Sequence, residues 1–163
     1  TGELMSRFAG KCRGVIGVDS SPEMLARARE GVLGKEQNIE LRLGELEHLP
    51  LRDHEADAAV SNMVLHHVSV PAAAIREAAR ILQPGGLLLI TGFAKHDQES
   101  IREKYGGVWL GFSREEMHQW LENAGFHLET FQEYPVNHGV LIHEYLARKS
   151  ETSRRTNGNH RQV

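Results

Sequence analysis

Short apolar runs alternate with segments of helical periodicity along most of this chain, and this alternation limits the folds open to it. Gly14–Val18 is an apolar run too short for a helix, and it follows apolar residues spaced as on one helical face. Leu87–Ile90 is another such run, and it follows a helical pattern that includes Ile75 and Ala78. The alternation predicts an α/β fold, with a Rossmann-like, doubly wound and mostly parallel sheet that has helices on both faces.

Capping residues and glycines set the expected ends of the helices. A helix should begin near Ser21, where a serine can cap and the next residue is proline. A second helix should stop at the run Gln83–Gly86, which contains Pro and two Gly. Ser113 and Glu116 form a capping box for a third helix, and Gly125 stands where a left-handed C-terminal cap belongs.

The remaining strand patterns lie between and after these helices. Ile39–Leu43 alternates apolar and polar residues, and Asp57–Val64 is largely apolar. Two final strands, Phe126–Phe131 and Val140–Ala147, have a short connection and should therefore be antiparallel. The segment Lys149–Val163 has no periodicity and few apolar residues, so we expect a structured domain over 1–148 and a disordered tail after it.

Composition excludes several classes of function. The chain has 163 residues and a formal net charge of −3 without a long basic run, which argues against contact with nucleic acid. No apolar run approaches the roughly 20 residues that a membrane-spanning helix needs. A single cysteine, Cys12, cannot form an internal disulfide, and we expect a reducing, cytoplasmic compartment.

Polar residues that follow the predicted strands are the candidates for a ligand site, because doubly wound sheets bind ligands beyond the carboxyl ends of their strands. Asp19 ends one strand and precedes a helix, a position from which a carboxylate can accept both hydroxyls of a nucleotide ribose. Glu45 follows the next strand and could accept from an exocyclic amine. Asn62 and Met63 interrupt a third strand close to the expected cleft.

Four sequence blocks, at 15–25, 44–50, 64–68 and 82–86, include or directly follow these strand ends, and they occur in a particular order. In this order and spacing the blocks resemble those of the class I S-adenosylmethionine-dependent methyltransferases of the type 11 or UbiE-like group. The resemblance covers nearly the whole sequence up to residue 148. The stretches 96–103 and 109–113 are further similar to methyltransferase domains fused behind ArsR-type regulators. The resemblance therefore implies a winged-helix domain in the full-length protein.

The resemblance also implies S-adenosylmethionine as the cofactor and assigns roles to individual residues. Gly2 would be the last glycine of the nucleotide loop, Asp19 with Ser20 would bind the ribose, Glu45 and Leu46 would lie against adenine, and Asn62 and Met63 would line the methionine side. The family's first strand, which is central in its sheet, and most of its glycine-rich loop should stand before Thr1. We therefore expect a fragment whose cofactor site is incomplete.

Methyl transfer from a sulfonium needs a base only when the acceptor arrives protonated. His66, His67 and His96 are the candidate bases, since imidazole titrates near neutral pH, although each could equally serve only as a hydrogen-bonding group of a loop. If the chain at His66 and His67 is extended, the two rings should point in opposite directions. No histidine spacing indicates a metal site.

Residues 94–112 form a long insertion that could act as a lid over an acceptor pocket. Its aromatic residues Tyr105, Trp109 and Phe112 could line that pocket or pack onto the core. The favoured function is methyl transfer to a small-molecule acceptor. A non-catalytic module that senses S-adenosylmethionine or S-adenosylhomocysteine within a transcriptional regulator is the alternative, and a nicotinamide-dependent oxidoreductase fits the blocks less well.

Overall fold

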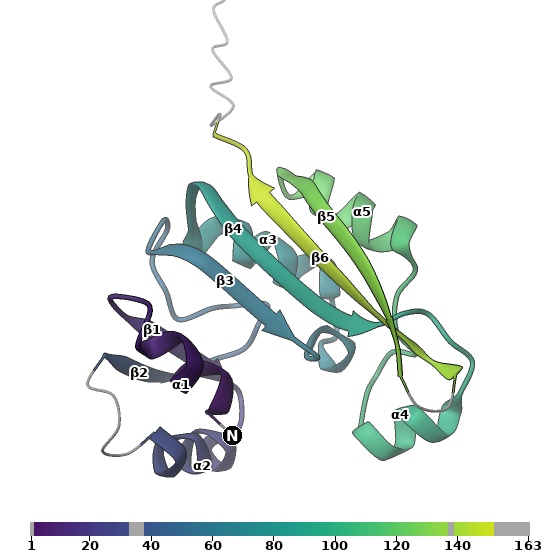
Figure 1. Ribbon diagram of the computed structural model, residues 1–163, viewed down its shortest axis with the longest axis horizontal. Coiled ribbons are helices and arrows are strands. Elements are labelled where there is room, and N and C mark those ends of the chain that lie inside the picture. Colours follow the sequence, from purple (N-terminus) through teal and green to yellow (C-terminus); the bar gives the residue numbers. More distant parts are fainter. Residues whose placement is uncertain (1, 33–37, 137–138, 152–163) are drawn as a thin grey trace, which may run out of the picture.

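Helices and strands alternate through most of the chain in a computed structural model that describes residues 2–32, 38–136 and 139–151 (Figure 1). The fold is α/β with an antiparallel C-terminal strand pair, which confirms the expected class. In chain order the elements are α1 (Glu3–Ala9), β1 (Val15–Asp19), α2 (Pro22–Val32), β2 (Ile39–Leu43), β3 (Ala56–Asn62), the 3-10 helix η1 (Leu65–His67), α3 (Pro71–Ile81), β4 (Leu82–Phe93), α4 (Glu99–Tyr105), α5 (Arg114–Asn123), β5 (Phe126–Pro135) and β6 (Leu141–Lys149).

The strands form two sheets. One contains β1 and β2 in parallel, and the other has the order β3-β4-β6-β5. In the larger sheet β3 and β4 are parallel, while β6 is antiparallel to both β4 and β5. Within the described residues, β1 and β3 each have a strand neighbour on one side only, so each presents an edge of unpaired backbone groups.

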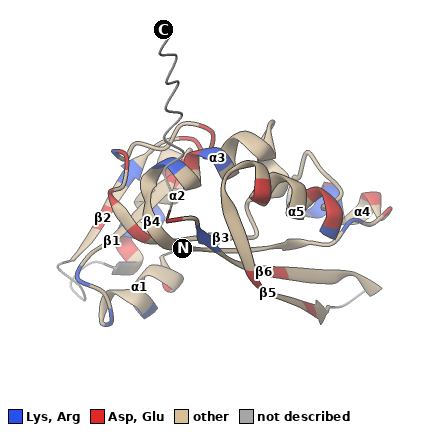
Figure 2. Ribbon diagram, turned by 90° about the horizontal axis from the view of Figure 1, so that it is seen from above, with Lys and Arg blue, Asp and Glu red and all other residues tan. Residues whose placement is uncertain are grey.

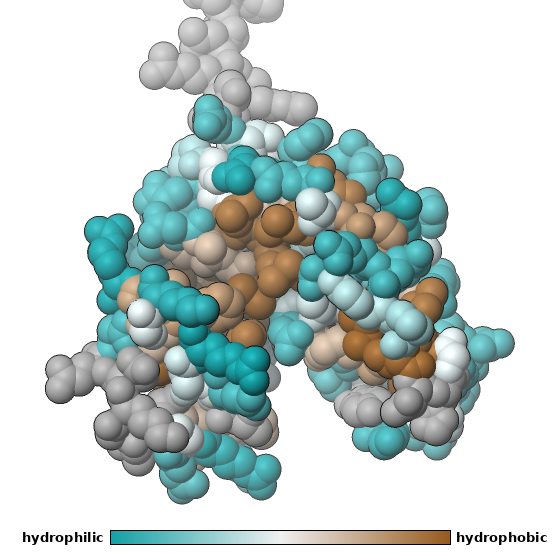
Figure 3. Space-filling model, in the orientation of Figure 1, coloured by the Kyte–Doolittle hydropathy of each residue, from teal (hydrophilic) through white to brown (hydrophobic). Residues whose placement is uncertain are grey.

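Helices lie on both sides of the strands, as expected, with α3 and α5 on one side and α1 on the other (Figure 2). The main core forms between α3, α5 and the larger sheet, where Ile75, Leu82, Leu88 and Leu121 are fully buried. The opposite face of that sheet is more open. Val60 on β3 is 42% exposed there, and Figure 3 shows an apolar surface in this region.

Several boundaries differ from the sequence expectation, three of them with a clear physical or positional consequence. β3 ends at Asn62 because Met63 adopts a left-handed conformation, with φ 54°, that turns the chain out of the strand. β4 begins at Leu82, since Leu82 already pairs with Ala56 across an irregular step, so the expected turn at 83–86 lies within the strand. Lys149 is the last residue of β6, one residue beyond the expected domain boundary, and 152–163 of the expected tail lie outside the described residues.

The capping box of α5 is confirmed. Ser113 Oγ accepts a hydrogen bond from the backbone N–H of Glu116 at 3.1 Å, and Glu116 Oε2 accepts from the N–H of Ser113 at 2.8 Å. At the other end of the helix Gly125 has φ 84°, the left-handed conformation expected of its cap. These bonds fix the start of the helix that carries the buried Met117 and Leu121.

Replacing Ser113 with Ala should lower the free energy of unfolding by about 1 kcal/mol, because the N–H of Glu116 loses its acceptor. Urea denaturation followed by circular dichroism measures this change. Ser150→Ala is the control, since Ser150 is exposed and bonds to Gly125 through its backbone N–H. Equal effects of the two substitutions would show that the cap does not stabilise α5.

Candidate functional site

The carboxyl ends of β1 and β2 lie next to each other. The N–H of Gly44, which follows β2, donates to the carbonyl of Asp19 at 3.1 Å. Asp19 is half-buried, and its Oδ1 accepts from the N–H of Ser21 at 2.8 Å. Ser20 between them is exposed. Since none of the described groups hydrogen-bonds to Asp19 Oδ2, this oxygen is available to a ligand.

The segment after Gly44 carries the other two candidates of this sheet. Glu45 is exposed, whereas Leu46 is half-buried and packs against the main core. The adjacent Glu47 accepts from the backbone N–H groups of Ser69 and Val70, at 3.1 and 3.3 Å. The turn beside Asp19 is therefore attached to the larger sheet through the chain that leads into α3.

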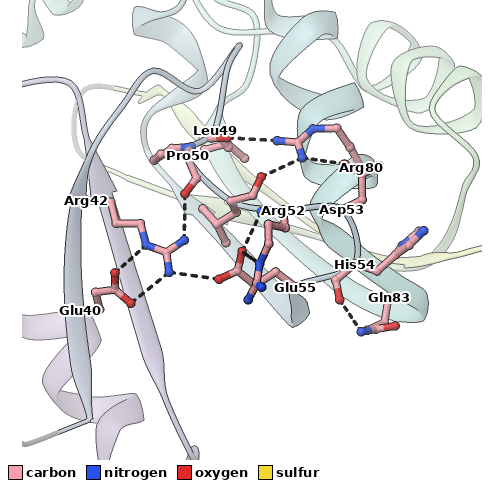
Figure 4. A network of polar contacts seen from close by, with 11 residues as sticks. Glu40, Arg42, Leu49, Pro50, Arg52, Asp53, His54, Glu55, Arg80 and Gln83 are labelled. Atoms are coloured by element: carbon pink, nitrogen blue, oxygen red, sulfur yellow. Dashed lines mark hydrogen bonds and ion pairs between the residues drawn. The ribbon is translucent and has the colours of Figure 1, made fainter.

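Arg42 on β2 holds the loop between β2 and β3 in place (Figure 4). Its guanidinium donates to Glu40 at 2.8 Å, to the carbonyl of Pro50 at 2.8 Å and to Glu55 at 3.0 Å. The N–H of Arg52 and then Arg42 lower the pKa of Glu55 to about 2, since both donate to its carboxylate. Glu55 is thus ionised at neutral pH, and its ion pair with Arg42 joins the end of the loop between β2 and β3 to β2.

Arg80 on α3 fixes the middle of this loop (Figure 4). It donates to the carbonyls of Leu51 and Leu49 at 2.8 and 3.0 Å, and to Asp53 at 2.9 Å. It also pairs with Glu77, one turn away on the same helix, at 2.8 Å, and this hydrogen bond lowers the pKa of Glu77. Arg80 and Arg42 together therefore set the path of the loop that connects the two sheets.

Asn62 and Met63 lie at the carboxyl end of β3, beside the end of β4. The hydroxyl of Thr91 donates to Asn62 Oδ1 at 2.6 Å, and the N–H of Met63 donates to the carbonyl of Thr91 at 2.9 Å. The Asn62 side chain is exposed, while Met63 packs against the small cluster of Phe93, Ile101 and Val140. Thr91 orients the amide of Asn62, and the sequence did not single it out for that role.

Gly2 precedes α1 with φ 78°, a conformation that glycine adopts without strain. Its carbonyl accepts from the N–H of Ser6 at 3.0 Å, so it belongs to the first turn of α1. The helix in turn lies directly on β1, because a Cβ added at Gly17 would stand 2.2 Å from Met5 Sδ. Gly2 is therefore associated with the smaller sheet.

The candidate cofactor residues consequently fall on both sheets. Gly2, Asp19, Ser20, Glu45 and Leu46 belong to the smaller sheet and its connections, and Asn62 and Met63 belong to the larger sheet. β1 in the smaller sheet and β3 in the larger sheet each have a strand neighbour on one side only, among the described residues. The structure gives no hydrogen bond between Asp19 and Asn62 among the residues it describes.

The three candidate bases gather around one phenylalanine. The ring centroid of Phe93 lies 5.2 Å from that of His66 and 5.8 Å from that of His96, and the rings of His66 and His67 are 4.1 Å apart. The opposite directions expected of His66 and His67 in an extended chain do not apply, because this segment is a 3-10 helix. They differ in burial, however, since His66 is 4% exposed and His67 is exposed.

The insertion covers His66. The N–H groups of Val108 and Trp109 both donate to the His66 carbonyl, at 2.8 and 3.1 Å, and the indole N–H of Trp109 donates to Val68. Gly107 lies so close that an added Cβ would be 2.9 Å from His66 Cδ2. Phe112 is buried in the main core, whereas the side chain of Tyr105 lies outside the described parts.

Burial lowers the pKa of His66 from its ordinary 6.5 to about 4, with smaller effects from His67 and His96. Because the unfolded chain then binds a proton that the folded chain does not, stability should fall as the pH falls from 6.5 toward 4. Between pH 7 and pH 5 we expect a loss of about 2 kcal/mol from this group.

Denaturation of the protein and of His66→Gln at both pH values measures this contribution. The variant should lose about 2 kcal/mol less than the parent on acidification. Equal losses would mean that His66 is not held neutral by the fold.

A methyltransferase domain family matches residues 1–90 of the sequence. This chain belongs to that family. The methyltransferase domain is 33% identical over 130 residues to an arsenite methyltransferase from Halobacterium salinarum, a match that covers 76% of the chain and 33% of that protein. It is 32% identical to the ubiquinone/menaquinone biosynthesis C-methyltransferase UbiE of Pseudomonas putida, over 69% of the chain and 46% of that protein. The chain thus spans less than half the length of these two relatives.

Solved structures support the same fold for the methyltransferase domain. A SAM-dependent methyltransferase from Methanosarcina mazei superposes with a TM-score of 0.78 at 20% identity, covering 93% of the chain and 89% of that structure. S-adenosylmethionine is the cofactor that the family implies. The chemistry of the residues present fits it, since Asp19 at the end of β1 keeps one carboxylate oxygen free for ribose hydroxyls.

Other kinds of site find less support in the methyltransferase domain. Among the described residues, no group of three or more His, Cys, Asp or Glu side chains is placed to hold a metal ion. No described helix is both long and apolar enough to cross a membrane.

Proposed function

We propose that this methyltransferase domain transfers a methyl group from S-adenosylmethionine to a small-molecule acceptor. The observation that carries the proposal is the placement of Asp19, Glu45 and Asn62 at the carboxyl ends of three parallel-paired strands, β1, β2 and β3. Ligands of doubly wound sheets bind at this edge. The histidine cluster under the insertion lies beyond β3, where an acceptor would approach.

Each candidate residue has a role that its surroundings support. Asp19 Oδ2 would accept the ribose hydroxyls, while its Oδ1 stays bonded to the N–H of Ser21. Glu45 and Leu46 would lie along the adenine, Leu46 as an apolar surface held by the core. Asn62 would bind the methionine portion with an amide already oriented by Thr91. Gly2 and Ser20 would contribute backbone groups, and Met63 an apolar wall.

When bound, the sulfonium supplies a methyl group whose leaving group departs neutral, so the protein has to align the acceptor and, where the acceptor arrives protonated, remove its proton. His66 remains neutral at pH 7 because of its lowered pKa, and it can therefore accept a proton. His67 and His96 lie on the more accessible side of the same cluster. We propose that one of these three imidazoles is the base for a protonated acceptor.

The two open edges suggest what completes the cofactor site. β1 and β3 are both parallel to their own partners, and each has an unpaired edge. Val60 on the edge strand β3 is 42% exposed. Strands of parallel sheets carry such apolar side chains because they are normally covered. We propose that the full methyltransferase has a further strand between β1 and β3, and that the loop after it joins the Asp19 side of the site to the Asn62 side.

The names of the relatives suggest two acceptor classes, arsenite and a quinol-like ring. Arsenite is a soft centre that favours thiolates, and this chain has Cys12 alone, exposed after α1. Aromatic and imidazole rings line the region under the insertion instead, with Phe93 central. We therefore favour an organic, ring-containing acceptor.

Formation of S-adenosylhomocysteine tests the proposal directly. The complete gene product that contains this chain should release it from S-adenosylmethionine with demethylmenaquinol-type quinols or simple phenols, and not with arsenite. Tight cofactor binding without turnover on any acceptor would favour a sensing module. No cofactor binding by the complete protein would contradict the proposal.

A further inference from the structure

A small hollow lies beside Gly92, between β4, β6, η1 and α5. Its volume is about 10 Å³, and Phe93, Phe112 and Met117 form apolar parts of its wall. An added Cβ at Gly92 would meet nothing within 4 Å, which independently shows the free space. A hollow of this size accommodates one water molecule if polar groups face it.

Three polar side chains line this hollow, those of His66, Tyr145 and His143. Only 4% of His66 is exposed, and its Nδ1 has no hydrogen-bond partner among the described groups. Tyr145, which is 2% exposed, lines the hollow from β6. Burial raises the pKa of the Tyr145 hydroxyl, which therefore stays protonated and can donate. A buried nitrogen without a partner is costly, so a bridging water would stabilise this arrangement.

Hydrogen bonds continue from Tyr145 to the surface. The Tyr145 hydroxyl and His143 Nδ1 are 2.9 Å apart, and His143 Nε2 lies 2.9 Å from Glu133 Oε2. His143 has 9% of its side chain exposed, whereas Glu133 has 51%. With Tyr145 donating to Nδ1, the Nε2–H donates to Glu133, so the chain of bonds ends at solvent.

We propose that His66, one water molecule in this hollow, Tyr145, His143 and Glu133 form a proton path from the histidine cluster to the protein surface. A proton on His66 Nδ1 passes to the water, the water gives one to the Tyr145 oxygen, the tyrosine hydroxyl proton moves to His143 Nδ1, and the Nε2 proton leaves through Glu133. Each group gains and loses one proton, so the transfer balances, but His143 is left with its proton on Nδ1. Rotation of the Tyr145 hydroxyl and return of His143 to its Nε2–H tautomer restore the starting state. The use of the path in methyl transfer rests on the proposed function, whereas its existence does not.

The charged and titratable groups around the path are consistent with it. His67 and His96 stand beside His66, and their charges disfavour a second positive charge there. Arg114, Glu115 and Glu133 are the charged groups that act on Tyr145. The surroundings of His66 therefore disfavour its protonated form, whereas Glu133 at the other end of the path is exposed to solvent. Both features favour movement of a proton from His66 toward the surface.

Exchange of the His66 ring N–H proton with water, measured by NMR on protein labelled with ¹⁵N-histidine, tests the path without cofactor or acceptor. Tyr145→Phe removes only the hydroxyl, and Gly92→Ala places a methyl group in the hollow. Each should slow the exchange by about tenfold or more, since the water link is broken. Gly10→Ala, whose Cβ would also meet nothing within 4 Å, should leave the rate unchanged.

The unfolding midpoints of the three variants are the control for loss of the fold, and we expect all three proteins to be folded under the conditions of the exchange measurement. An unchanged rate in Tyr145→Phe overturns the path, and an unchanged rate in Gly92→Ala overturns the water link on which it depends. Slowed exchange in a complete protein that methylates no acceptor would support the path and contradict the proposed function, so the two failures are distinguishable.

Discussion

Replacing Asp19 with Ala should weaken the binding of S-adenosylmethionine to the complete protein by about 10- to 150-fold. A charge-assisted hydrogen-bond partner contributes about 1.5–3 kcal/mol to binding, and that range corresponds to this change in Kd. In the variant the ribose hydroxyls would lack the carboxylate that we propose accepts them through its free Oδ2. Isothermal titration calorimetry with the parent and variant proteins measures the difference.

Glu30→Ala is the matched control for Asp19→Ala. Glu30 is an exposed acid on α2, so its removal changes the net charge equally and should leave Kd unchanged. Asp19→Asn provides a second comparison, because an amide can still accept from the N–H of Ser21. If Asp19→Ala and Glu30→Ala bind the cofactor equally well, Asp19 is not part of the site.

Replacing Arg80 with Met should destabilise the fold by about 2–3 kcal/mol. The carbonyls of Leu49 and Leu51 would lose a charged donor, and Glu77 would lose the cation with which it pairs. The Arg80 side chain is 31% exposed, so solvent compensates part of the loss and keeps the effect below that of a fully buried ion pair. The aliphatic stem of Met preserves most of the packing.

Arg76→Met on the same helix is the control, since Arg76 is exposed. Urea unfolding of both variants, monitored by tryptophan fluorescence, gives the two free energies. The Arg80 variant should lose at least about 1.5 kcal/mol more than the Arg76 variant. Equal losses would mean that the network of Figure 4 does not hold the loop between the sheets.

Local patterns predicted most elements of the fold because their causes are local. The capping box at Ser113 and Glu116 and the glycine at 125 each depend on a few neighbouring residues. The end of β3 was missed because Met63 has no glycine-like signal for its positive φ. Its conformation depends on the bond to Thr91, which comes from a distant strand.

The candidate site was predictable where it depends on strand order, and not where it depends on packing. Asp19 and Asn62 could be named because a polar residue after an apolar strand marks the edge where ligands bind. The pairing of His143 with Tyr145 and Glu133 could not be named in advance. A spacing of two on β6 places His143 and Tyr145 on one face, but the contact with Glu133 depends on the register of β5 against β6.

Arg42 and Arg80 were likewise missed, since their partners include backbone carbonyls and carboxylates of a loop without a sequence pattern. Such bonds form only after the two sheets are in place. The network nevertheless determines where the turn that carries Glu45 stands. Residues outside the four recognised blocks thus position residues inside them.

A crystal structure of the complete protein with S-adenosylhomocysteine tests the central claim most directly. The nucleoside should lie across the carboxyl ends of β1 and β2, with both ribose hydroxyls within hydrogen-bond distance of the Asp19 carboxylate and the adenine against Leu46. The amino-acid portion should reach toward Asn62 at the end of β3. Cofactor bound at the opposite edge of the strands, or away from Asp19, would contradict this account.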